Sequence, residues 1–172
     1  MIRSVLLIAA MLLAAAPALA QEPVGCDKFK WSVDRERALL ASSAQMPSGS
    51  ALRQPLGIAV TVALAPYAGA RLPTPPSRAP KAAGSYAGFI DAGAVPKSGT
   101  YRVTLSAPAW IDIVQNEHTL QSTAFSGVSG CAGIAKSVKF DLAASPFIVE
   151  FSGTTAHALT FVVTADRTKH QE

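Results

Sequence analysis

Apolar and polar residues alternate with a period of two along much of the chain after residue 56. The clearest case is residues 99–115, where the run TYRVTL is followed, after a proline, by a second run that begins at Trp110. Strict alternation places one set of side chains on a buried face and the other toward water. We therefore predict two strands that form the central hairpin of the core. Arg102 and Asp112 are then expected to be cross-strand partners on its solvated face.

The same alternation predicts further strands, separated by turn signals, at residues 56–64, 85–90, 136–142, 146–152 and 156–164, with a weaker one at 120–125. The strand at 85–90 is expected to lie at a sheet edge. Short alternating strands with frequent turns are typical of an antiparallel sandwich or barrel. Sheets of this kind have one wet face, unlike a parallel sheet that is covered on both faces. We expect a mostly β fold, an antiparallel, jelly-roll-like β-sandwich with one short N-terminal helix.

Residues 32–40 (SVDRERALL) have the pattern of that helix, with Ser32 as a plausible N-cap and its Arg and Glu residues on a solvated face. Residues 41–55 are rich in Ser, Gly and Pro and are predicted to form a loop. Residues 65–80 contain five prolines and favour extended geometry. They are interpreted as a stiff connection along the sandwich edge, with a proline-rich recognition segment as the alternative.

The first twenty residues, MIRSVLLIAAMLLAAAPALA, have the features of a secretory signal peptide: a basic start, an apolar core and a small-x-small cleavage site. The apolar run is shorter than the roughly 20 residues that a membrane span needs, and no other such run follows. Cys26 does not directly follow the expected cleavage site, which argues against a lipid anchor. These features predict export to the periplasm or the medium, with no membrane span in the mature chain.

The predicted organisation is therefore a signal peptide (1–20), an N-terminal segment with a short helix packed on the sandwich (21–55), the sandwich itself (56–165) and a polar tail (166–172). The remaining length suits one domain with its own core. The net charge is only +4 and the charges are scattered, without the basic stripe that tracks phosphates. Nucleic acid is therefore not expected as a partner.

The two cysteines, Cys26 and Cys131, are predicted to form a disulfide, because an even count in an exported chain favours pairing. The bond would tie the N-terminal segment to a late loop. A reactive or metal-binding thiol is the alternative, but the chain has no C-x-x-C motif.

A metal site would require several His residues and a carboxylate at suitable spacing. The candidates are His118, Glu117 and His157, which could meet only if two loops meet; His170 lies in the polar tail. The other interpretation is that these are ordinary surface histidines.

The sequence gives little support for a hydrolytic active site. The run Gly127–Cys131 (GVSGC) superficially resembles a nucleophile elbow but lacks its second glycine and its strand-turn-helix context. Asp112, Asp141 and Glu150 are strand carboxylates that could pair for glycoside cleavage. Isolated acids that point outward from strands usually face solvent, and that is the interpretation we favour here.

Aromatic residues could supply a platform that stacks on a ligand, and Trp31, Tyr67, Tyr86 and Trp110 are the candidates. Trp110 is the most interesting because it shares a strand face with Asp112. Trp110, Asp112 and Tyr86 are therefore the predicted ligand-binding residues. For Trp110 itself, however, the interpretation that we favour is that it plugs one end of the core.

The order of the segments GCDKFKW, DRERALL, RLPTPPSRAPK, SYAGFI, GTYRVTLSAPAWIDIVQ and AFSGVSGCAGIAKSVKFDL resembles a group of small exported proteins of α-proteobacteria. Some members carry the label homogentisate 1,2-dioxygenase, which implies an iron ion held by a His/His/Glu set. The last third is weakly similar to the pre-peptidase C-terminal type of β-sandwich, an accessory domain of secreted bacterial enzymes.

The favoured function is a non-catalytic periplasmic protein that binds a small molecule, a glycan or a protein, with no cofactor. The alternatives are a metal-dependent oxygenase, with iron as its cofactor, and an accessory carbohydrate-binding module.

Overall fold

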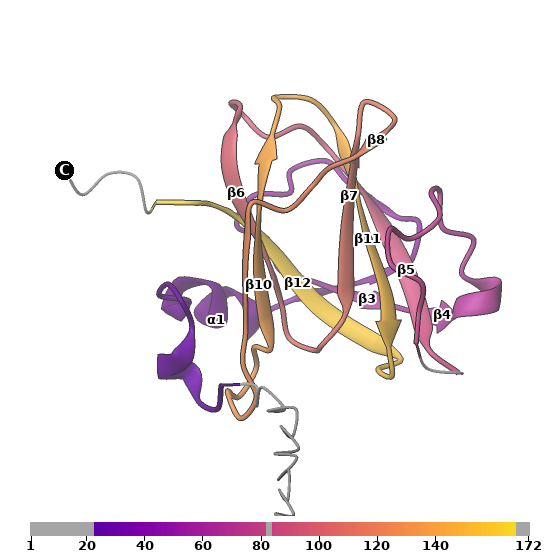
Figure 1. The fold of residues 1–172 in the computed structure, drawn as a ribbon. Helices are drawn as coiled ribbons and strands as arrows, with labels where there is room; N and C mark the ends of the chain where they lie inside the picture. Colours follow the sequence, from indigo (N-terminus) through magenta and orange to yellow (C-terminus); the bar gives the residue numbers. More distant parts are fainter. Residues whose placement is uncertain (1–22, 82–83, 168–172) are drawn as a thin grey trace, which may run out of the picture.

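The computed structural model describes residues 23–81 and 84–167. The predicted signal peptide and residues 168–172 of the predicted polar tail lie outside these ranges. The described chain folds into two β-sheets that pack face to face, with one short α-helix against the outside of one sheet (Figure 1). This arrangement confirms the predicted β-sandwich with one N-terminal helix.

The first sheet has the strand order β1 (Ala44–Pro47), β3 (Val60–Ala63), β12 (Ala158–Ala165), β6 (Gly99–Leu105), β10 (Lys136–Leu142) and β9 (Ala124–Gly127). The second sheet has the order β2 (Ala51–Leu52), β5 (Tyr86–Ala92), β11 (Phe147–Thr154), β7 (Trp110–Gln115) and β8 (His118–Thr119). A short strand β4 (Ala65–Pro66) also pairs with β5.

Most of the strands after β2 alternate between the sheets along the chain, so that β3, β6, β10 and β12 lie opposite β5, β7, β8 and β11. The order β3-β12-β6-β10 against β5-β11-β7-β8 is that of a jelly roll. Only β1 with β3 and β2 with β5 pair in parallel among the described strands. The strand β5 is flanked by β11 and by the short β2 and β4, so it is not the bare edge strand that was predicted.

The predicted hairpin across residues 99–115 is wrong. β6 pairs with β10 and β12 in the first sheet, whereas β7 pairs with β11 and β8 in the second. The chain crosses between the sheets at residues 106–109, and Arg102 and Asp112 lie on opposite outer faces of the sandwich rather than beside each other. Alternation specifies which face of a strand is buried, but it carries no information about the neighbouring strand.

The core lies between the sheets and consists of the inward-facing residues of both. Its largest fully buried members include Phe140, Phe147, Phe151, Phe161, Leu105 and Ile113. The alternation correctly assigned these inward positions. The strand predicted at 56–64 would also have placed Ile58 in the core, but β3 begins only at Val60 and Ile58 is 40% exposed.

The N-terminal segment covers the outer face of the first sheet. It contains the 3-10 turn η1 (Cys26–Lys28) and the helix α1 (Asp34–Leu40), and a second small core forms beneath it from Val33, Leu40, Val128, Ile134 and Val162. A second 3-10 turn, η2 (Tyr67–Gly69), follows β4.

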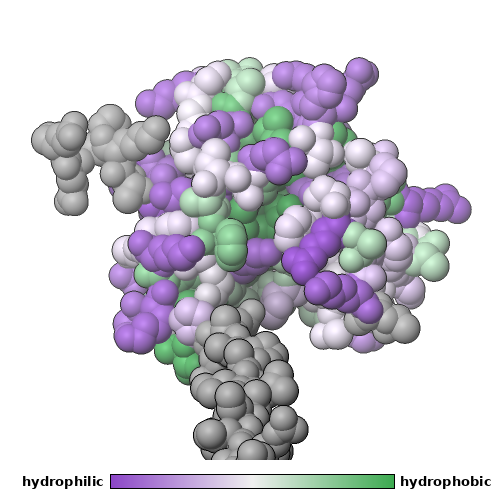
Figure 2. Space-filling model, viewed as in Figure 1, coloured by the Kyte–Doolittle hydropathy of each residue, from purple (hydrophilic) through white to green (hydrophobic). Residues whose placement is uncertain are grey.

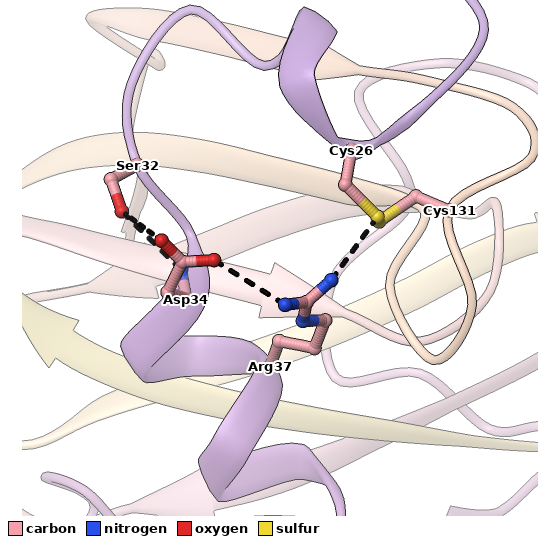
Figure 3. Close-up of a disulfide and its surroundings, with 5 residues drawn as sticks. All are labelled: Cys26, Ser32, Asp34, Arg37 and Cys131. Carbon is pink, nitrogen blue, oxygen red and sulfur yellow. Dashed lines mark hydrogen bonds and ion pairs between the residues drawn. A yellow bond between two sulfur atoms is a disulfide. The ribbon is translucent and has the colours of Figure 1, made fainter.

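The predicted disulfide is confirmed, with the Cα atoms of Cys26 and Cys131 4.8 Å apart. It joins η1 to the loop between β9 and β10, and Arg37 Nη1 donates to Cys26 Sγ at 3.4 Å (Figure 3). The bond fits a protein that resides outside the reducing cytoplasm. No helix in the described part of the chain is long and apolar enough to span a membrane.

The helix differs from its prediction in two respects. Val33 rather than Ser32 occupies the N-cap position, but the Ser32 hydroxyl accepts a hydrogen bond from the backbone N–H of Asp34 at 3.4 Å and donates to the Asp34 carboxylate at 3.1 Å (Figure 3). Glu36 does not lie on a solvated face, since it is 2% exposed and accepts a 2.5 Å hydrogen bond from the Thr164 hydroxyl of β12.

Two stretches predicted as loop or strand are also different. Residues 41–55 contain β1 and β2, which lie at the edges of the two sheets and, at four and two residues, are too short to show alternation. The weak strand predicted at 120–125 begins only at Ala124, as β9. Residues 120–123 bridge from the second sheet to the first.

Candidate functional site

The proline-rich residues 71–80, which we call the strap, lie across the outer face of the second sheet. The backbone N–H of Thr74 donates to Glu150 Oε1 at 2.9 Å, and that of Ser77 donates to Asp112 Oδ2 at 3.1 Å. The Ser77 hydroxyl also hydrogen-bonds to Asp112 Oδ1. The strap therefore does more than connect strands along the sandwich edge, as was predicted: it covers polar side chains of β7 and β11.

Asp112 and Glu150 are directly opposite each other in the register of β7 and β11. They are 5% and 2% exposed, so the prediction that both face solvent is wrong; the strap excludes water from them. Asp141, in contrast, is exposed as predicted and accepts a 2.6 Å hydrogen bond from the Thr100 hydroxyl.

Glu150 is incompletely satisfied. Its Oε1 accepts from Thr74, whereas its Oε2 is buried with no hydrogen-bond partner in the described part of the chain. Burial raises the pKa of Glu150 above its ordinary value of 4.5, the Thr74 N–H opposes that rise, and the negative charge of Asp112 adds to it.

Trp110 lies at the start of β7, half-buried, on the same outer face as Asp112. Its indole N–H is within hydrogen-bond distance of Ser77 Oγ (2.9 Å) and Asp112 Oδ1 (3.1 Å). The Arg78 guanidinium and the Lys136 ammonium each lie 5.1 Å from the ring centre. Trp110 thus packs outside the second sheet and does not fill the end of the core.

Next to Trp110 the sandwich is open along one edge, between β7 of the second sheet and β9 and β10 of the first. A slot of about 340 Å³ enters there. Its inner wall is apolar and comes from the core residues Ile111, Val138 and Phe140 together with Leu120. Figure 2 shows this hollow as hydrophobic surface between β10 and β7, bordered by hydrophilic residues.

The rim of the slot combines groups from three segments. The strap contributes Ser77 and Arg78, the bridging residues 120–123 contribute Gln121 and Ser122, and β9 contributes Phe125, which is 59% exposed. Asp112 and Trp110 form the wall beneath the strap. The slot can therefore hold an apolar group against the core while its rim contacts a polar one.

No protein-family model, curated protein or solved structure matches this chain. The resemblances to small exported α-proteobacterial proteins and to the pre-peptidase C-terminal type of sandwich therefore stay predictions. The functional interpretation of the site is based on its geometry alone.

The residues of the predicted metal set lie in different turns. Glu117 and His118 belong to the β7–β8 hairpin, where the positive φ angles of Asn116 and Glu117 suit a two-residue turn. His157 lies in the β11–β12 turn with its ring 4.2 Å from that of Tyr86. Within residues 23–81 and 84–167, no three His, Cys, Asp or Glu side chains are grouped so that they could hold a metal ion.

Of the three predicted ligand-binding residues, the structure brings together Trp110 and Asp112 at the slot, whereas Tyr86 contacts His157 instead. Sequence reasoning missed Ser77 and Arg78. The only signal for them was two polar residues inside a proline-rich run, and nothing local indicates which strand face such a run covers.

Proposed function

We propose that this chain is an exported, periplasmic, non-catalytic binding protein that holds a small amphiphilic molecule in the slot, apolar end first. The observation that carries the proposal is an opening at the sandwich edge whose inner wall is made of core side chains and whose rim is polar. Its volume of about 340 Å³ falls within the range of small-molecule sites.

The rim favours a ligand whose polar end accepts hydrogen bonds or carries negative charge. Asp112 already accepts from Ser77 and Trp110, so its oxygens are largely used within the protein. The groups that remain exposed at the rim are the Arg78 guanidinium, the Gln121 amide and the Ser122 hydroxyl. An exposed guanidinium is well suited to a carboxylate or sulfonate.

Two observations favour binding over catalysis and over glycan recognition. Glu150 lies under the strap and does not line the slot, and the Asp112 oxygens in the slot wall already accept from Ser77 and Trp110, so this pair of acids is not available to act on a bound molecule. Cations lie over the ring of Trp110, which leaves less of that ring free to stack on a sugar.

Export is supported by two independent features. The first twenty residues have the sequence of a signal peptide, and Cys26 is paired with Cys131. Fractionation of a bacterial host followed by mass spectrometry tests this part. The protein is expected in the periplasm with Gln21 as its first residue. A protein that stays in the cytoplasm with residues 1–20 still attached would contradict the proposal.

Two fluorescent probes test the slot: 8-anilino-1-naphthalenesulfonate, which has a negative charge, and the neutral N-phenyl-1-naphthylamine. Both are expected to bind saturably. Ser122→Trp, which fills the mouth, is expected to weaken both at least tenfold, whereas the control Gln54→Trp, an exposed position away from the slot, leaves both unchanged.

Arg78→Gln is expected to weaken the sulfonate probe about fivefold and to leave the neutral probe unchanged, because it removes only the charge at the rim. Lys97→Gln, at an exposed position away from the slot, removes the same charge and is the matched control. Probe binding that Ser122→Trp does not affect would contradict the proposal, and so would saturable binding of neutral oligosaccharides alone.

A further inference from the structure

A second hollow lies on the outer face of the first sheet, where the N-terminal segment meets that sheet, and it shares no lining residue with the slot. It encloses about 370 Å³, and the residues that matter for its chemistry are Lys30, Trp31, Arg35, Glu36, Arg102 and Arg167. We call it the N-terminal hollow. Four of these six side chains carry a positive charge and one a negative charge.

The charges at the base of the N-terminal hollow are balanced. Arg102 is buried and donates through Nε and Nη2 to Asp166 Oδ1 at 2.9 and 2.6 Å, and its Nη1 lies 3.9 Å from Glu36 Oε1. Lys139 Nζ lies 2.7 Å from the other oxygen of Asp166. Two cations and two carboxylates therefore compensate one another below the surface.

The rim of the hollow has no such compensation. Lys30, Arg35 and Arg167 are exposed, and none has a carboxylate within 4 Å in the described part of the chain. The other acids of this region are already used, since Asp27 pairs with Lys28 and Asp34 pairs with Arg37. Like charges that converge on one concavity raise its potential and attract anions.

The geometry points to a binding site for a small soluble polyanion, a molecule with two or more carboxylate or phosphate groups. Arg35 and Arg167 offer planar guanidinium groups that can bind such groups in a bidentate manner, and Lys30 adds a compact charge. Trp31 holds the wall in place, because its indole N–H donates to Ser137 Oγ at 3.2 Å and its ring lies 4.4 Å from Lys139 Nζ.

The disulfide fixes the segment that carries two of the three rim cations. Cys26 precedes Lys30 by four residues and is bonded to Cys131 of the β9–β10 loop, while the backbone N–H of Lys30 donates to Ser126 Oγ at 3.0 Å. The rim is thus held to the sheet before a ligand arrives, which reduces the entropy lost on binding.

Calorimetric titration of the purified exported protein with pyrophosphate and with citrate tests the site. Saturable binding at low ionic strength is expected for at least one of them, with at least tenfold weaker affinity in the double variant Arg35→Gln/Arg167→Gln. The control Arg53→Gln/Lys97→Gln removes the same net charge from exposed positions elsewhere, and its affinity is expected to change less than twofold.

Three outcomes would overturn the inference. The first is that neither anion binds saturably. The second is an equal loss of anion affinity in the two double variants. The third is that, in a parallel cosedimentation assay, the protein binds only to vesicles that contain phosphatidylglycerol. The second would mean that the net charge of the chain attracts the anions, and the third that the surface recognises a membrane instead. Circular dichroism of each variant verifies folding, and both double variants replace exposed side chains.

Discussion

Asp112 on β7 and Glu150 on β11 are direct cross-strand neighbours, and both carboxylates are buried under the strap. Two acids in such a pair are unfavourable when both are ionised, because burial removes their hydration and their charges repel. The strap offsets part of this cost through the N–H groups of Thr74 and Ser77. The pair therefore binds the strap to the second sheet, and Asp112 also forms part of the slot wall. Glu150 makes the stability of the protein depend on pH.

Replacing Glu150 with Gln is expected to stabilise the protein at pH 7 to 8. The pKa of Glu150 is raised in the folded state, chiefly by burial, so the folded protein holds this proton more tightly than the unfolded chain. Stability of the wild type should consequently fall as pH rises from about 4.5 through the raised pKa, and Glu150→Gln should lack that fall.

Urea titrations from pH 4 to 8 measure the effect as the difference in free energy of unfolding between Glu150→Gln and the wild type. The difference is expected to grow with pH and then level off. Glu117→Gln, at an exposed turn, is the control and should show no such growth. A difference that is independent of pH would show that Glu150 titrates alike in the folded and unfolded states.

Asp112→Ala is expected to destabilise the protein by about 1.5–3 kcal/mol, since it removes a charged acceptor that binds the strap. The backbone and hydroxyl of Ser77 and the indole of Trp110 lose their shared partner. Looser attachment of the strap should also accelerate tryptic cleavage after Arg71 and Arg78. The exposed Asp141→Ala serves as control, with a cost below about 1 kcal/mol. Unchanged cleavage in Asp112→Ala would argue against a role of Asp112 in holding the strap.

The double variant Cys26→Ser/Cys131→Ser is expected to lose about 2–5 kcal/mol of stability, because the disulfide restricts a long loop in the unfolded chain. Denaturant titration measures the loss. In the wild type, a thiol assay under denaturing, non-reducing conditions should detect no free cysteine. Two reactive thiols in that assay would mean that the isolated protein does not carry the bond.

Arg102→Gln is expected to cost about 3 kcal/mol, because it leaves the buried carboxylates of Glu36 and Asp166 short of positive charge. The matched control is Arg37→Gln, whose partner Asp34 is exposed and 3.5 Å away, with an expected cost below about 1 kcal/mol. Equal losses of stability in the two variants would show that burial adds nothing to the Arg102 interactions.

The period-two pattern was sufficient to predict the fold class and the position of most long strands. Phe140, Val149 and Phe161 are buried where alternation placed them, because a strand that packs on a core must turn every second side chain inward. The disulfide followed from an even number of cysteines in a chain that was predicted to be exported. The burial pattern of a strand is a local property and the number of cysteines is a compositional one, so both can be read from the sequence without knowledge of the tertiary structure.

Strand partners and the covering of the outer faces were decided by tertiary structure alone. Residues 99–115 look the same whether they form a hairpin or cross between sheets, and the jelly-roll order makes them cross. Arg102 and Asp112 occupy outward positions that alternation assigns to solvent. They are buried because α1 and the strap, distant in sequence, pack over them. Such coverage depends on contacts between segments 35 to 70 residues apart, and no local pattern encodes it.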